Sequence, residues 1–285
     1  MAAFNLSLDP AQIEITLKPN AVFTQAYNIT NNSTSTLLLS SSVSAWVPAD
    51  KEGGVIYQDT VDSPLIFSLS NTDLKLGQDF TLKAGQKKQL VLKIVNPSIE
   101  EKDYYLTFFI SQKPYTQIQS DHQNLAKIGS HLLITTGQES SVISNFKVSK
   151  LNISPKIKDI FTPLTISGEI ANDGQHYNHI DGQLTIYKDN QVYSEQILFP
   201  YTVIPQHSRL LMCVNSDSEV LPCHLKIPIW PGKYQGIITL SGNSTKYEYP
   251  FSFFVFPYTP TIFILFIFFI FALILKKKQK NISPH

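Results

Sequence analysis

Short runs in which apolar and polar residues alternate recur along most of the chain, and turn residues separate them. Ile13, Ile15 and Leu17 alternate with polar neighbours, and a longer run from Leu37 to Val47 continues the pattern. Alternation with a period of two places one side of a strand in a core. Because no helix-length run with a 3.6-residue period lies between these segments, the pattern predicts an all-β fold.

The first domain is expected to span residues 4–137 and to hold seven to nine strands. Two of its segments, Ile15 to Asn32 and Phe80 to Pro97, share a plan: a strand ending in Thr-Leu-Lys, a Pro or Gly turn, a long alternating strand and a turn that begins with Asn. A β-sandwich uses such steps repeatedly, because each strand leaves one sheet by a tight turn and presents an apolar face to the other. Chance similarity between hairpin-like segments is the alternative.

The second domain is expected to span residues 138–257, after a polar joint at Gln138 to Ser141. Its alternating runs predict about seven strands, and Asp189-Asn190 between two such runs predicts a compact hairpin. The predicted strands cover residues 146–153, 164–172, 182–188, 191–198, 208–214, 225–228, 234–240 and 247–256. The fold class is therefore two tandem immunoglobulin-like β-sandwiches followed by one helix.

That helix is expected at residues 258–275, which carry no charge and are rich in Phe, Ile and Leu. Eighteen residues of helix measure about 27 Å, close to the hydrocarbon thickness of a bilayer. A basic tail at residues 276–285 follows and includes Lys276, Lys277, Lys278 and Lys280. The positive-inside tendency places this tail in the cytoplasm, so a single-pass cell-membrane protein with both domains outside the cell is predicted. A buried core helix or strand is the alternative.

The start of the chain lacks the charged and apolar segments of a signal peptide. We expect a start codon assigned too far downstream, or a leader that has been removed. The formal net charge is +1, from 23 basic and 22 acidic residues, and no basic stripe occurs outside the tail. Nucleic acid is therefore not expected as a partner.

Cys213 and Cys223 are the two cysteines, and nine residues separate them. Outside a membrane they can be oxidised, so a disulfide closing a polar loop between two strands is predicted. Free thiols in a reducing setting are the alternative. A zinc site that also uses His224 would need a second close cysteine pair to be specific.

Candidate catalytic or metal-binding residues are few. Asp173, His176, His179 and Asp181 form the densest group of possible metal ligands, but the glycines at 174 and 182 indicate a solvated turn. Asp121 and His122 occur in another polar loop, without a nucleophile elbow. Trp46 and Trp230 are interpreted as core or rim residues. We therefore predict no catalytic site, no metal site and no cofactor, and the sequence does not indicate which residues bind a ligand.

Several segments resemble known surface domains. The runs SGEIANDG (residues 167–174) and GQLTIY (residues 182–187), and Pro231 to Tyr234, are similar to immunoglobulin-like domains of bacterial surfaces. The Leu-Lys-Pro-Asn turn at residues 17–20 and the strand ending in Asn resemble the first domain of bacterial proteins that interact with WxL proteins. That family has the same order of parts. The resemblance implies a first domain associated with peptidoglycan and a second associated with proteins.

The leading hypothesis is a non-enzymatic, membrane-anchored adhesion or scaffold protein of a bacterial envelope, which binds a wall polymer or another surface protein. The second is a chaperone-like assembly factor for surface subunits, since the first domain also resembles periplasmic chaperones. The third is a surface hydrolase that uses Asp121, His122 or the group around His176. An Arg/Lys pair that anchors a partner's carboxylate would distinguish the second hypothesis from the first.

Overall fold

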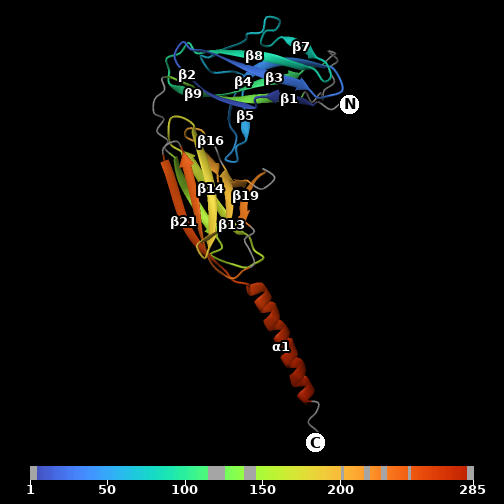
Figure 1. Ribbon diagram of the computed structural model, residues 1–285, viewed down its shortest axis with the longest axis vertical. Coiled ribbons are helices and arrows are strands. Elements are labelled where there is room, and N and C mark those ends of the chain that lie inside the picture. Colours follow the sequence, from blue (N-terminus) through green and yellow to red (C-terminus); the bar gives the residue numbers. More distant parts are fainter. Residues whose placement is uncertain are drawn as a thin grey trace. The chain divides into compact units, whose positions relative to one another are not determined.

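The structure is a computed structural model that describes residues 5–114, 126–137, 146–199, 202–214, 219–225, 230–242 and 245–280. Figure 1 shows its strands and its C-terminal helix. The chain divides into two compact units, residues 1–142 and 143–285. Each unit is described by itself.

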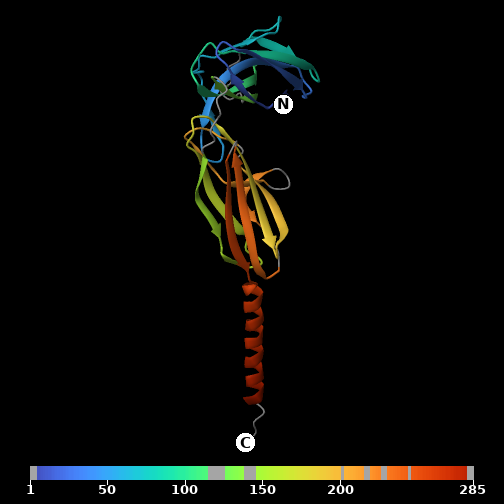
Figure 2. The same cartoon turned by 60° about the vertical axis from the view of Figure 1, so that its left-hand side comes forward.

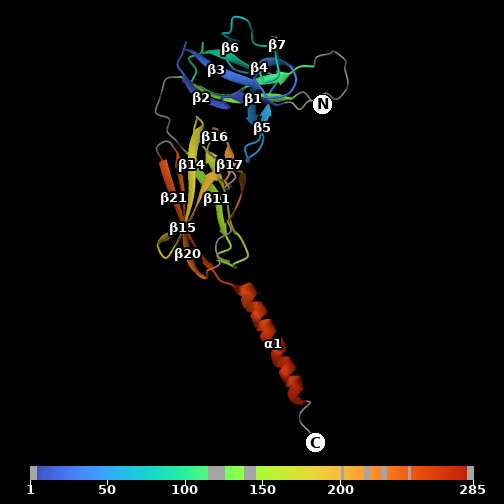
Figure 3. The ribbon, with the colours of Figure 1, turned by 45° about the vertical axis from the view of Figure 1, so that its right-hand side comes forward.

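Unit 1 is a sandwich of two sheets, and Figure 3 labels strands of both. One sheet holds, in order, β1 (Leu6–Asp9), β3 (Val22–Asn31), β8 (Lys87–Val95) and β6 (Ile66–Leu69). The other holds β2 (Gln12–Leu17), β10 (Lys127–Thr136), β9 (Lys102–Gln112), β4 (Leu37–Pro48) and β5 (Val55–Tyr57), and β7 (Asp79–Leu82) pairs with β4. The rings of Tyr27 on β3 and Phe108 on β9 are both fully buried, and their centroids lie 4.8 Å apart. The core therefore lies between the sheets.

Unit 2 is also a sandwich, but β19 pairs with both β13 and β18 and so joins its two sheets into one continuous strand order. Figure 2 shows the early strands of this unit in green and its last strands in orange and red. The strand order is β11 (Phe146–Ser154), β13 (Leu164–Asn172), β19 (Val220–Leu225), β18 (Met212–Val214), β15 (Gln191–Phe199), β14 (Asn178–Lys188), β20 (Gly232–Gly242), β21 (Thr245–Val255) and β12 (Ile157–Lys158). Two short strands join from the side: β16 (Thr202–Val203) pairs with β14, and β17 (Ser208–Leu210) pairs with β13. Buried Ile166, Leu184, Ile238 and Phe253 belong to one core cluster. Burying each such side chain contributes about 1.5 to 3 kcal/mol.

Both units begin with a chain segment that changes sheets. In unit 1, β1 pairs antiparallel with β3 and β2 then pairs parallel with β10. In unit 2, β11 pairs antiparallel with β13 and β12 then pairs parallel with β21. The peptide bonds Asp9–Pro10 and Ser154–Pro155, which lie between the paired segments, are both cis. The predicted all-β, immunoglobulin-like sandwich fold is confirmed.

Most predicted strands are present, but the described residues hold ten strands in unit 1 and eleven in unit 2, more than the seven to nine and about seven expected. The main differences in extent are in unit 2. The strand expected at residues 182–188 begins at Asn178, so His179 and Asp181 lie on a strand and not in a turn. The strand expected at 208–214 is divided into β17 and β18. The strand expected at 225–228 is instead β19, which ends at Leu225, and residues 226–229 lie outside the described part. The expected hairpin is present at Asp189 and Asn190, whose φ values of 50° and 63° suit a tight turn between β14 and β15.

The helix α1 (Tyr258–Lys280) continues five residues past the predicted end, into the basic run. Its segment Tyr258–Lys276 has a mean hydropathy of 2.5, and the rest of the protein buries none of it. A helix that is apolar on every side lowers its free energy by entering protein or lipid. Among the described residues, this helix is the one long and apolar enough to cross a membrane.

Candidate binding surfaces

The predicted ligand group in the second half of the chain is spread over two elements. Asp173 follows β13, and its carboxylate lies 2.7 Å from the ammonium group of Lys147. His179 lies on β14, where its Nδ1 is 3.3 Å from the hydroxyl of Thr202 and its Nε2 is 4.0 Å from the carboxylate of Asp181. Among the residues that the structure describes, no three His, Cys, Asp or Glu side chains are placed to hold one metal ion.

The other predicted candidates do not join this group. His176 lies in the turn after β13, and its backbone carbonyl accepts a hydrogen bond from the side chain of Asn172. The Nδ1 atom of His224 is 3.2 Å from the hydroxyl of Thr165. Asp121 and His122 lie outside the described residues.

Cys213 and Cys223 form a disulfide in the structure, with Cα atoms 4.9 Å apart. Cys213 lies on β18, where its partner in the ladder is Leu221 of β19. Cys223 lies further along β19, in the part of that strand that pairs with β13, and its partner there is Ile166. Both cysteines are buried and belong to the core cluster of unit 2. The bond therefore joins the two strands on either side of residues 215–218, which lie outside the described residues, and both cysteines pack in the core.

Aromatic side chains gather on the face of unit 1 that points away from its core. This outer aromatic cluster consists of Trp46 on β4, Tyr57 on β5, Tyr105 and Phe109 on β9, and His131 on β10. Ring centroids lie 5.2 Å apart for Trp46 and Tyr105, and 4.8 Å apart for Tyr57 and Phe109. The strand period produces this arrangement, because odd-numbered residues of β9 and β10 point outward while even-numbered ones fill the core.

Polar contacts hold the outer aromatic cluster in place. The indole N–H of Trp46 donates a hydrogen bond of 3.1 Å to the carbonyl of Leu106. The Nδ1 of His131 is 3.0 Å from the hydroxyl of Thr107, and burial lowers the pKa of this imidazole. The ammonium group of Lys127 lies 4.4 Å from the centre of the Phe109 ring and 5.0 Å from that of Tyr57.

Trp46 was expected in the core or at its rim, and the structure places its half-buried ring on the outer face and not in the core. Residue types alone do not show this, because β4 has apolar residues on both of its faces. By the two-residue period, Trp46 belongs to the other face of β4 from Val43 and Ala45, which pack against the core. Trp230 precedes β20, and its exposed fraction is 68%.

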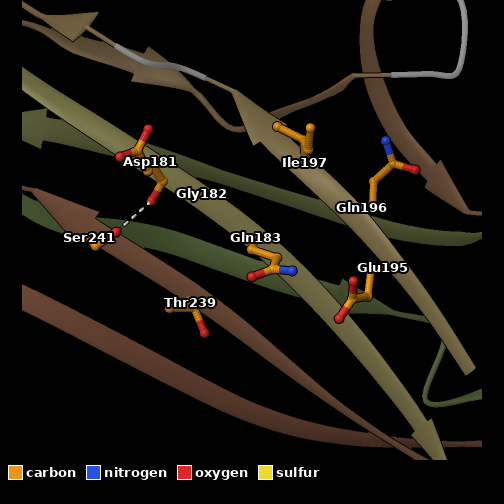
Figure 4. Close-up of a pocket in the computed structure, with 8 residues that line it drawn as sticks. All are labelled: Asp181, Gly182, Gln183, Glu195, Gln196, Ile197, Thr239 and Ser241. Atoms are coloured by element: carbon orange, nitrogen blue, oxygen red, sulfur yellow. Dashed lines mark hydrogen bonds between the residues drawn. The ribbon is translucent and has the colours of Figure 1, made fainter. Parts of the chain in front are cut away.

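The outer face of unit 2 is hollowed, and polar and apolar side chains together line its recesses. Its first recess, which we call the outer recess, has a volume of about 350 Å³ and lies over β14, β15 and β20 (Figure 4). Gln183 lies opposite Thr239 in the ladder, and Asp181 lies opposite Ser241. The hydroxyl of Ser241 donates a weak hydrogen bond of 3.5 Å to the backbone carbonyl of Asp181. Residues lining the outer recess are Asp181, Gly182, Gln183, Glu195, Gln196, Ile197, Thr239 and Ser241.

Comparison with known proteins gives no match to a family model and no match to a curated protein. Similar solved structures include several chaperones, among them chaperones of fimbriae and pili, and also a PapD-like domain of human CEP192. The class 5 fimbriae chaperone CfaA is 12% identical with a TM-score of 0.41, over 89% of this chain and 100% of that chain. The YadV chaperone is 10% identical with a TM-score of 0.39, over 87% and 98% of the two chains.

A third similar structure is the CsuC–CsuE chaperone–tip adhesion subunit pre-assembly complex of Csu pili from Acinetobacter baumannii. It is 10% identical with a TM-score of 0.39, over 88% of this chain and 98% of that chain. The WxL-interacting family that the sequence resembles is not shown by the comparisons. Similarities at this level concern the fold, and the function has to be argued from the residues of this chain.

Proposed function

We propose that the protein is a membrane-tethered, non-enzymatic binding protein of a bacterial cell envelope. The observation that carries the proposal is helix α1, which is apolar over Tyr258–Lys276 and unburied, and which follows two β-sandwich units. Such a helix is stable in a bilayer. The basic residues Lys276, Lys277, Lys278 and Lys280 favour the cytoplasmic side for its end, and on this basis we propose that the sandwiches lie outside.

The partner that we propose is a surface protein or a wall polymer. Two surfaces support binding: the outer aromatic cluster of unit 1 and the outer recess of unit 2. Rigid aromatic rings contribute large contact areas at a low cost in conformational entropy. A cation beside such rings, as Lys127 is, adds a polar anchor.

A chaperone-like assembly factor is the second candidate, and one edge of β10 favours it. β2 pairs with one edge of β10, but only from His131 onward. Along the same edge, Lys127 to Ser130 have no strand partner among the described residues. The N–H of His131 donates to the carbonyl of Ala11 on this side, so by the two-residue period Lys127 and Gly129 direct their N–H groups the same way. A partner's strand can be added to such an edge.

A pull-down from native envelope extract with the full chain in detergent tests both candidates. We compare the unchanged protein with Lys127→Pro and Lys127→Ala. Proline removes the N–H that faces the open edge, but pairing with β9 is kept because the adjacent hydrogen bond runs from Gln112 to the carbonyl of Ala126. Alanine removes the ammonium group but keeps the backbone N–H group at the open edge.

Loss of an enriched protein with Lys127→Pro alone favours the assembly role. Loss with both variants favours binding at the outer aromatic cluster. Recovery of neither a protein nor a polysaccharide above the level of an unrelated tethered sandwich contradicts the proposed function.

A further inference from the structure

The outer face of unit 2 carries a second recess in line with the outer recess. This second recess has a volume of about 410 Å³, and its lining includes Tyr187, Lys233, Gln235 and Ser252. In the ladder of β14 and β20, Asp181 opposite Ser241 marks one end and Tyr187 opposite Gln235 marks the other. Six residue steps along a strand correspond to roughly 20 Å. The two recesses share no lining residue, but both lie along this ladder, and we call the two together the outer groove.

Strand addition cannot explain ligand binding in the outer groove. β14 pairs with both β15 and β20, and β20 pairs with both β14 and β21, so the backbone groups of these strands are used in ladders. A ligand here is therefore recognised by side chains. This separates the outer groove from the open edge of β10 in unit 1.

The side chains of the outer groove are of the types that bind hydroxyl groups. Carboxylates accept hydrogen bonds, amides both donate and accept, and hydroxyls do the same. The tyrosine ring at one end offers an apolar face for stacking. The polar and aromatic members are Asp181, Gln183, Tyr187, Glu195, Gln196, Lys233, Gln235, Thr239, Ser241, Phe251 and Ser252.

Charge and geometry restrict the ligand further. Asp181 and Glu195 line one recess and Lys233 lines the other, so two carboxylates outnumber one ammonium group and a polyanion would be repelled at the end with the carboxylates. Ile197 is 52% exposed beside them and supplies an apolar contact. The face is open to solvent, since the side chain of Asp181 is 72% exposed. An elongated, uncharged ligand with many hydroxyls satisfies these conditions.

We propose that the outer groove binds a linear, uncharged polysaccharide that lies along β14 and β20. The proposal rests on the proposed function of an envelope-binding protein and names its ligand class and site. Gln183 and Thr239 at the centre contact successive hydroxyls, and Glu195 accepts hydrogen bonds from neighbouring hydroxyls of one sugar. Stacking on Tyr187 fixes the end of the bound segment.

Isothermal titration calorimetry of the full chain in detergent micelles tests the site. The probes are cello-, chito- and manno-oligosaccharides, with poly(glycerol phosphate) as the polyanion. We expect one neutral series to bind, with affinity rising with chain length until the groove is filled. Gln183→Ala and Glu195→Gln each lower the affinity about tenfold, which corresponds to roughly 1.4 kcal/mol.

Asp173→Asn is the matched control, because Asp173 is a carboxylate that follows β13, lines neither recess and pairs with Lys147 at 2.7 Å. We expect this variant to bind as the unchanged protein does. The proposal is overturned if no neutral series binds, if only the polyanion binds, or if both groove variants fold and bind normally. The pull-down uses native envelope extract and the titration uses pure oligosaccharides, so a negative result in one does not decide the other. The proposed function and the proposed groove can therefore be contradicted separately.

Discussion

The side-chain amide of Asn31 donates a hydrogen bond of 2.9 Å to the backbone carbonyl of Leu82, 51 residues further along the chain. The same amide donates to the carbonyl of Ser35, and its Oδ1 accepts from the N–H of Ser33. Asn31 ends β3 in one sheet of unit 1, and Leu82 ends β7 beside the other sheet. One fully buried side chain therefore ties the two sheets together.

A reciprocal bond explains the internal sequence similarity of unit 1. The amide of Asn96 donates to the carbonyl of Leu17 at 3.1 Å, so each of the two similar segments provides an asparagine for the Thr-Leu-Lys turn of the other. The two long strands of these segments, β3 and β8, are antiparallel neighbours. Equivalent environments select the same residues at both positions.

Unit 2 contains an asparagine with the same pattern of hydrogen bonds. The amide of Asn172 donates to the carbonyls of Val203 and His176, at 2.8 Å each, and its Oδ1 accepts from the N–H of Gly174 at 2.9 Å. The sequence offsets of two and four residues repeat those of Asn31. The two units thus close their sandwiches by the same local interaction.

We predict that Asn31→Ala lowers the free energy of unfolding of unit 1 by about 2 to 4 kcal/mol. The change removes several hydrogen bonds and leaves buried carbonyl and N–H groups without partners, which costs more than the bonds contribute. The measurement is urea unfolding of the full chain in detergent, followed by Trp46 fluorescence in a Trp230→Phe background. Asn32→Ala is the control, because Asn32 is exposed. Equal losses in both variants would contradict the prediction.

Asn172→Ala is expected to destabilise unit 2 by a similar amount of about 2 to 4 kcal/mol, since it removes the same set of bonds. Hydrogen exchange measured by mass spectrometry reports each unit separately. We expect faster exchange in β13 and β14, with exchange in β3 and β8 unchanged. Faster exchange in both units would mean that the asparagine acts beyond its own sandwich.

The all-β class and most strands follow from the alternation of side chains, because a sheet with one buried face imposes the period directly. The outer aromatic cluster does not follow. On β9, residues 104–110 are mostly apolar or aromatic on both faces, so the pattern does not reveal which face packs inside. The hydrogen-bond partners of Asn31 and Asn96 cannot be predicted from neighbouring residues either, because they depend on how strands far apart in the sequence pack together.

Part of the second unit was predicted wrongly for a physical reason. The glycine at position 182 was expected to mark the end of a turn and the start of a strand, but β14 begins at Asn178 and Gly182 lies within it. A Cβ atom there would lie 2.7 Å from the Cβ of Leu198, so the residue is glycine because β15 approaches closely. Turn chemistry and close strand packing both select glycine, and the sequence alone does not separate them.

Cys213 and Cys223 are predicted to be joined in protein purified unreduced from an oxidising compartment. Because both are buried, Cys213→Ala with Cys223→Ala costs about 2 to 4 kcal/mol, from the lost cross-link and from small voids in the core. Mass spectrometry after alkylation reads the redox state. Recovery of both residues as alkylated thiols would contradict the pairing.

Protease added to intact cells is expected to remove the region from Phe4 to Phe256 and to leave an epitope tag on the C-terminal tail protected. The reason is the charge bias of Lys276, Lys277, Lys278 and Lys280 beside the apolar helix. A tag digested in intact cells would show that the orientation is inverted. Protection of both regions would show that the sandwiches are not on the cell surface.

Lys158 on β12 is expected to make the stability of unit 2 depend on pH. Its side chain is fully buried, and its ammonium group donates hydrogen bonds to the carbonyls of Asp159, at 2.9 Å, and Thr162. Loss of hydration lowers the pKa of Lys158 from its usual 10.5, while the charge of Asp159 acts in the opposite direction.

The sign of the dependence follows from proton binding. Between the lowered pKa of the folded state and 10.5, the unfolded state binds more protons, so the free energy of unfolding rises with pH through that interval. Lys158→Met keeps much of the side-chain volume and removes the titrating group. We expect urea unfolding of this variant, followed in the alkaline range up to pH 10.5, to lose the rise that the unchanged protein shows. Lys156→Met, which alters an exposed lysine on the same segment, is expected to keep it. If Lys158→Met and the unchanged protein show the same pH dependence, desolvation of Lys158 has no part in the stability of the unit.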